Sequence, residues 1–185
     1  FFELAVTATG GLWATTPEQG LYEVSPTPRH HHPRLALPES RIRAIGSLSD
    51  ALWILAEDNL VCFDGTQFLP TEKPLPAGSL LSLVATEDTL WIGATRGLWS
   101  YAPGTNSWAR EKEVPSRVTA VVGDHQNLWA ATSEGVFLRK SGQWKRISDD
   151  EIPQTHARDL AIAGDILWAG SSAGLGRYQE NWSTL

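Results

Sequence analysis

The stretch that decides the fold is residues 90–98, which read Leu-Trp-Ile-Gly-Ala-Thr-Arg-Gly-Leu. Its Leu-Trp dipeptide recurs along the 185-residue chain, with the tryptophan at Trp13, Trp53, Trp91, Trp129 and Trp168, so that successive copies are 40, 38, 38 and 39 residues apart. Such a period is typical of proteins built from one supersecondary unit that cannot bury its apolar face alone. The sequence therefore predicts a repeat protein of five units.

Each unit is predicted to contain four β-strands. A short run of β-favouring residues, such as 80–84 or 118–122, precedes each Leu-Trp, and a Gly or Asn turn follows it. A further aromatic residue then marks an outer strand, at Phe68, Trp108, Trp144 and Trp182 in the last four units. The 16 glycines and 11 prolines interrupt any long helical pattern. The expected fold is all-β, a five-bladed β-propeller with four antiparallel strands per blade.

The chain is expected to form a single propeller domain over residues 1–185. Its blades are predicted at about 1–40, 41–78, 79–116, 117–157 and 158–185. Two arrangements fit five units: a closed ring, in which the first blade packs against the last, or an arc of a larger propeller. The complete set of strands favours the closed ring. A chain that opens on Phe1 and has no methionine also indicates a processed product or a part of a longer polypeptide.

The five repeated tryptophans are interpreted as structural residues. A tryptophan at the same place in every unit is expected to pack against the neighbouring blade, and its replacement by alanine to cost about 3–5 kcal/mol. Trp99 lies outside this shared position, on the expected third strand of its unit. A role for Trp99 in a contact surface is therefore kept as an alternative to simple packing.

Composition narrows the classes of partner. The net charge of −6 argues against nucleic acid and anionic membranes, and no apolar run is long enough for membrane insertion.

The single cysteine, Cys62, excludes an internal disulfide and is expected to be a small buried residue. Three adjacent histidines at 30–32 are expected in a solvated loop, because neighbours on an extended chain point in alternate directions and cannot easily share one metal. No metal and no cofactor is predicted.

Candidate ligand-binding residues lie in the loops of one propeller face, over the channel. Inter-blade connections carry arginines, and the turns between second and third strands carry charged residues; the candidates are Arg41, Arg96, Arg117, Arg158, Asp58 and Glu134. Converging arginines offer bidentate geometry for a carboxylate or phosphate. The alternative interpretation is that each arginine hydrogen-bonds loop carbonyls and pairs with a neighbouring acid, since repeats copy structural residues too.

Residues 114–121, 127–132 and 135–136, together with 90–98, resemble the two-component regulator propeller repeat. That pattern has a proline-containing turn, an Arg or Asn, a Val-x-Ala-Ile strand, Leu-Trp-Ile-Gly-Thr and Gly-Gly-Leu. The resemblance implies the sensor portion of a larger bacterial protein in an extracytoplasmic, periplasmic location. It implies seven blades, often in tandem, whereas this chain has five units.

The leading functional hypothesis is a non-catalytic binding module that takes a small ligand or a peptide on the channel face. The first alternative is a protein-interaction scaffold that uses the faces and rim to bind another protein or another domain of the same polypeptide. The second alternative, a glycan-processing or other enzyme, is disfavoured because the expected inner strands are mostly apolar and no pair of carboxylates is placed for acid–base chemistry.

Overall fold

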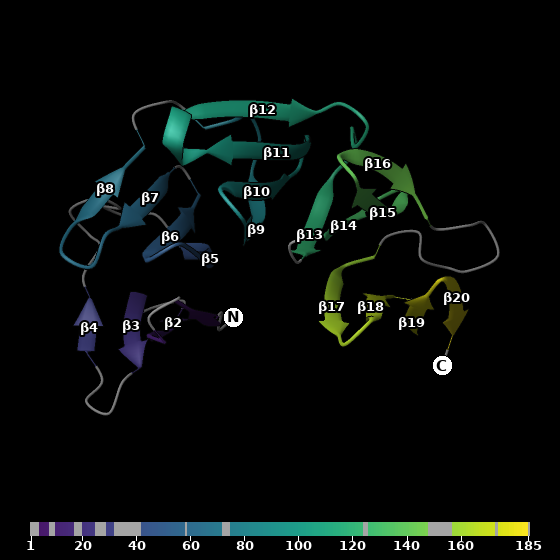
Figure 1. The fold of residues 1–185 in the computed structure, drawn as a ribbon, viewed down its shortest axis with the longest axis horizontal. Coiled ribbons are helices and arrows are strands. Elements are labelled where there is room, and N and C mark those ends of the chain that lie inside the picture. The colour runs from purple at the N-terminus through teal and green to yellow at the C-terminus, as the bar shows by residue number, and fades with distance from the viewer. Residues whose placement is uncertain are drawn as a thin grey trace.

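The fold is described from a computed structural model of the chain. It describes residues 4–7, 10–16, 20–24, 29–31, 42–57, 59–71, 75–123, 126–147, 157–172 and 174–184. These residues form five four-stranded antiparallel sheets that follow one another along an arc (Figure 1). The all-β class and the four strands per unit agree with the prediction. No helix of the described residues is long and apolar enough to cross a membrane.

Each sheet uses four consecutive strands. The first contains β1 (Leu4–Val6), β2 (Leu12–Thr16), β3 (Gly20–Val24) and β4 (Arg29–His31), and the second β5 (Ile42–Leu48), β6 (Ala51–Ala56), β7 (Leu60–Phe63) and β8 (Phe68–Pro70). The third contains β9 (Leu80–Thr86), β10 (Thr89–Ala94), β11 (Gly97–Ala102) and β12 (Ser107–Glu111). The fourth has β13 (Val118–Gly123), β14 (Asn127–Thr132), β15 (Gly135–Lys140) and β16 (Gln143–Arg146), and the fifth β17 (Asp159–Ala163), β18 (Ile166–Ser171), β19 (Gly174–Gln179) and β20 (Asn181–Thr184).

The glycine that follows the second strand in the third and fourth units is required by the turn. Gly97 and Gly135 have φ values of 116° and 119°, which L side chains rarely adopt. A Cβ on Gly97 would also lie 3.0 Å from the carbonyl oxygen of Val114. The turn therefore explains why a glycine recurs six residues after the repeated tryptophan in these units.

The histidine-rich stretch differs from the expectation. Residues 29–31 form the outer strand β4, in which His30 and His31 pair with Tyr22 and Leu21 of β3. A strand replaces the expected loop because the first unit, like the others, completes its sheet by pairing a fourth strand with the third. His32 lies outside the described residues.

The core lies between consecutive sheets. Trp13 packs among residues of the second sheet, Trp53 among residues of the third and Trp91 among residues of the fourth, and each is 6% exposed. Trp129 is half-buried and packs against the cluster that includes Leu160 of the fifth sheet. The inner-strand aliphatic residues that receive these tryptophans are Ile45, Leu83, Val121 and Leu160.

The arc does not close, contrary to the arrangement that the sequence favours. The first and last sheets lie at its two ends, well apart, and extensive packing among the described residues joins consecutive sheets (Figure 1). Leu4 occupies the position of Leu83 but is 64% exposed, and Val6 beside it is 58% exposed. At the other end, Leu175 is 43% exposed, whereas Leu98 and Val136 at the same position of the third and fourth sheets are fully buried. The two end faces thus lack the neighbour that every internal face has.

Candidate functional site

Two of the six predicted site residues meet in one cavity. Arg96, in the turn between β10 and β11, and Arg117, in the connection from β12 to β13, both line a cavity of about 420 Å³. Arg158 and Glu134 are exposed and do not line it. Arg41 and Asp58 lie outside the described residues.

We call this feature the arginine cavity. It lies beside the third sheet and is lined by Ala77, Thr95, Arg96, Trp99, Arg110, Pro115, Ser116 and Arg117. Trp99 belongs to the third strand and Arg110 to the outer strand, directly opposite each other in the β-ladder. The cavity therefore extends from the loops of the predicted face outward along the sheet, rather than over the channel.

Backbone contacts hold the walls of the arginine cavity in place. The guanidinium of Arg110 donates a hydrogen bond to the carbonyl oxygen of Arg96 at 3.1 Å and lies 6.0 Å from the ring centroid of Trp99. On the other side, the amide of Thr95 donates to the carbonyl oxygen of Ser79 at 2.9 Å. The amide of Ser79 donates to the Thr95 hydroxyl at 3.1 Å. These bonds fix the turn that carries Arg96.

The chemistry of the arginine cavity favours an anion. Three of its eight lining residues are arginines and none is acidic. The indole Nε1 of Trp99 and the hydroxyl of Ser116 are buried and lack a hydrogen-bond partner among the described residues. Guanidinium groups bind carboxylate or phosphate in bidentate geometry, and an aromatic face adds apolar contact. The arrangement can hold an anionic group next to an aromatic or apolar one.

Sequence reasoning missed Arg110. Its position on an outer strand gave no loop signal, and its place opposite Trp99 depends on the register of β11 and β12. That register is set by the turn at Pro103–Thr105 and by Asn106, which has a φ of 47°. A register count from this turn is the one sequence signal that could have paired the two residues.

Cys62 lies in surroundings that lower the reactivity of its thiol. It lies on β7, half-buried, and the pKa of its thiol is raised by burial and by the negative charge of Asp64. Because the thiolate is the nucleophile, a raised pKa lowers the reactive fraction at neutral pH.

We therefore expect Cys62 to react with a disulfide reagent at pH 8 at least about tenfold more slowly than free glutathione. The rate should approach that of glutathione once the protein is unfolded in urea. The release of the coloured thiol, followed by absorbance, measures both rates. A native rate equal to the unfolded rate would contradict this account.

Residues of metal-binding type do not gather in the described part of the chain: no group of three or more His, Cys, Asp or Glu side chains there could hold an ion. The side chains of the histidines at 30–32, as well as His125 and His156, lie outside what the structure describes.

Comparison with solved structures gives a clear result for the fold. The extracellular domain of the putative one component system BT4673 from B. thetaiotaomicron superposes with a TM-score of 0.79 at 14% identity, over 98% of this chain and 27% of that chain. The sheets are propeller blades. PorZ, a surface component of the type-IX secretion system of Porphyromonas gingivalis, aligns with a TM-score of 0.74 at 13% identity, over 98% of this chain and 27% of that one. A streptogramin B lyase aligns with a TM-score of 0.76 at 10% identity, over all of this chain and 67% of the lyase.

These similarities concern the blades alone, because the identities are low. The chain spans about a quarter of the length of the BT4673 extracellular domain and of PorZ. No protein-family model matches the sequence, and no curated protein matches it either.

Proposed function

We propose that this propeller is a non-catalytic binding module, whose arginine cavity takes a ligand with a carboxylate or phosphate next to an aromatic or apolar group. The observation that carries the proposal is the convergence of Arg96, Arg110 and Arg117 around Trp99, with no acid among the lining residues. Clefts of roughly 300–1,000 Å³ with a few convergent polar groups are the usual form of a ligand site.

A binding module of this kind fits best as the ligand-binding part of a sensor protein. The repeat resembles that of two-component regulator propellers, and the BT4673 neighbour is the extracellular domain of a putative one component system. By this proposal the chain is the ligand-binding part of a larger bacterial protein and acts outside the cytoplasm. The lyase neighbour shares the blade geometry at 10% identity, which supports no transfer of its activity.

Calorimetric titration tests the proposal. Phenyl phosphate, which joins an anion to a ring, is expected to bind more tightly than inorganic phosphate, which has no ring, and than phenol, which has no phosphate. Equal affinity for phenol and phenyl phosphate, or no heat with any of the three, would overturn it.

A second candidate function is interaction through the end faces. Leu4 and Val6 at one end and Leu175 at the other are exposed at positions that are buried in the internal blades, and Trp168 beside this second end face is half-buried. Each internal face is covered by an inner strand and a Leu-Trp strand of the next or preceding unit of the same chain. The partner that continues this interface is a further blade of the same repeat, carried on the same polypeptide.

Extending the chain tests this partner. A copy of residues 79–116 fused after residue 185 should protect Trp168 from oxidative labelling, because the copied Leu83 would cover it. Trp91 is the control and should stay protected in both proteins. Unchanged labelling of Trp168 in the extended protein would contradict the proposal. If Trp168 of the 185-residue chain instead became better protected as the protein concentration rises, a second copy of the chain would cover this face, which would also contradict the proposal.

A further inference from the structure

One position of the repeat changes its chemistry between blades. The residue of the third strand that lies opposite the leucine of Leu-Trp is Phe63, Tyr101, Arg139 and Tyr178 in the second to fifth sheets. Phe63 and Tyr101 make edge-on contacts with the tryptophan of the preceding blade, at ring-centroid distances of 5.4 and 5.7 Å. An arginine therefore stands where three other blades have an aromatic ring.

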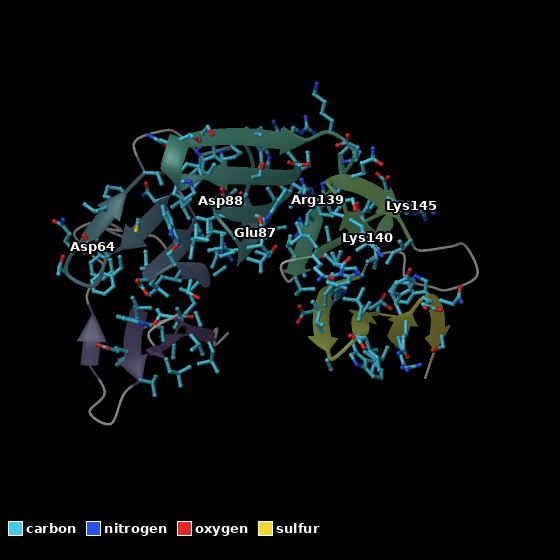
Figure 2. All side chains as sticks on the ribbon, in the orientation of Figure 1. Asp64, Glu87, Asp88, Arg139, Lys140 and Lys145 are labelled. Carbon is cyan, nitrogen blue, oxygen red and sulfur yellow. The ribbon has the colours of Figure 1, made fainter. Side chains whose placement is uncertain are left out.

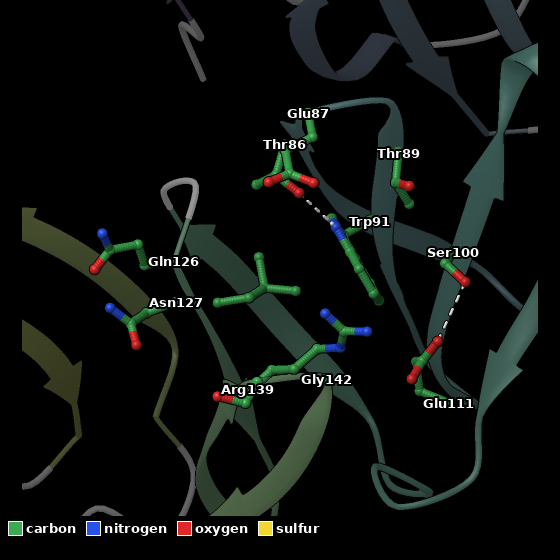
Figure 3. Close-up of a pocket in the computed structure, with 12 residues that line it drawn as sticks. Thr86, Glu87, Thr89, Trp91, Ser100, Glu111, Gln126, Asn127, Arg139 and Gly142 are labelled. Atoms are coloured by element: carbon green, nitrogen blue, oxygen red, sulfur yellow. Dashed lines mark hydrogen bonds between the residues drawn. The ribbon is translucent and has the colours of Figure 1, made fainter.

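Arg139 keeps the packing role of that position but leaves space beside it. Its guanidinium lies 4.8 Å from the ring centroid of Trp91, a cation–π contact that replaces the ring–ring contact. The Trp91 ring is held by the hydrogen bond that its indole N–H donates to the hydroxyl of Thr86 at 2.8 Å. A cavity of about 440 Å³ opens here between the third and fourth sheets (Figure 3), and Figure 2 labels Glu87 and Arg139 from its lining.

The guanidinium of Arg139 faces this cavity without a carboxylate partner among the described residues. Its Nε atom is buried without a hydrogen-bond partner, and no ion pair joins Arg139 to another described residue. Glu111 also lines the cavity but makes no ion pair with Arg139. It accepts hydrogen bonds from the Trp144 indole at 2.9 Å and from the Ser100 hydroxyl at 3.2 Å, and its carboxylate keeps lone pairs for a further donor. A buried polar atom left unpaired destabilises the free protein, and a ligand that accepts its hydrogen bond removes that cost.

The cavity carries charges of both signs. Arg139 supplies one positive charge, whereas Glu111 and Glu87, from the turn between β9 and β10, supply two negative ones (Figure 3). A simple anion would meet the two carboxylates, and a simple cation would meet the guanidinium. A zwitterion satisfies both, with its carboxylate on Arg139 and its ammonium beside the glutamates.

We propose that the cavity between the third and fourth blades binds a free α-amino acid, held at its carboxylate by Arg139 and at its ammonium by Glu87 and Glu111. The side chain of the amino acid would lie toward the polar residues that complete the cavity, among them Gln126 and Asn127. This site is separate from the arginine cavity, with which it shares no lining residue.

Titration with glycine, serine and glutamate, alongside acetate and methylamine, tests the site. At least one amino acid should bind the wild-type chain about tenfold or more tightly than acetate or methylamine, since each of these lacks one of the two charges. Glu87→Gln should weaken that binding about three- to tenfold, because it removes a partner of the ammonium from an exposed position.

The variant Arg139→Tyr gives a matched control, because tyrosine is the residue of the third and fifth blades at this position. It should fold with an unchanged or higher thermal midpoint and should lose amino-acid binding. Phenyl phosphate binding at the arginine cavity should survive in this variant, which separates the two sites. Acetate binding as tightly as the amino acids would reduce the site to a plain anion site and overturn the proposal. Amino-acid binding that persists in Arg139→Tyr, or no binding by any of the five compounds, would also overturn it and leave Arg139 with its packing role.

Discussion

Trp91→Ala is expected to lower the free energy of unfolding by about 3–5 kcal/mol, the usual cost of removing a buried tryptophan. Its ring is 6% exposed and lies in the cluster formed by the third and fourth blades, with Val121, Leu128 and Phe137. The equivalent change Trp168→Ala in the 185-residue chain should cost less than half as much, because no further sheet of the described residues packs over the fifth. Urea denaturation followed by circular dichroism measures both values.

The comparison between these two variants is more informative than either alone. They remove the same side chain from the same position of the repeat, so differences in strand propensity cancel. An equal cost would mean that Trp168 is packed in solution as Trp91 is, and the ring would then be closed by the first blade. Leu4→Ala gives the same test from the other end and should cost less than Leu83→Ala, whose side chain is 7% exposed.

The double variant Arg96→Ala with Arg117→Ala is expected to weaken phenyl phosphate binding by at least about tenfold. Hydrogen bonds to charged groups contribute about 1.5–3 kcal/mol each, and 1.4 kcal/mol corresponds to a factor of ten. Both side chains are exposed, so the variant should keep its thermal midpoint within a few degrees.

A matched control removes two arginines elsewhere. Arg158 and Arg177 do not line the arginine cavity, and their double replacement by alanine changes the net charge of the chain by the same amount. Binding should be within about twofold of wild type in this control at moderate salt, where charges beyond about 10 Å are screened. Equal losses in the two double variants would indicate a general effect of net charge and would contradict the site.

The repeat explains how much of the fold was predictable. A tryptophan every 38–40 residues reports contacts between neighbouring units, and those contacts are present between consecutive blades. Closure is a different property, because it depends on the rotation from each blade to the next. The inner strand of the first blade, Leu4–Val6, is as apolar as the internal ones, so its exposure leaves no trace in the sequence.

The sequence predicted those residues of the candidate site that lie in turns and connections. Arg96 and Arg117 lie at turn and connection positions that the repeat places on one face, and they line one cavity. Arg110 was missed because it needs the strand register. Arg139 was missed because its significance comes from the tyrosines and phenylalanine at the same position in other blades, which appear only when the third strands are aligned by their pairing.

The most direct test of the proposed function is the indole N–H spectrum of the nine tryptophans during titration with phenyl phosphate. Trp99 lies in the arginine cavity and its Nε1 is unpartnered, so its resonance should move with the ligand concentration. The resonances of Trp13, buried between the first and second blades, and of Trp182, whose indole donates to the carbonyl oxygen of Ile147, should stay in place. A titration in which Trp99 does not move, or moves no more than Trp13 and Trp182, would contradict the assignment of this cavity as the binding site.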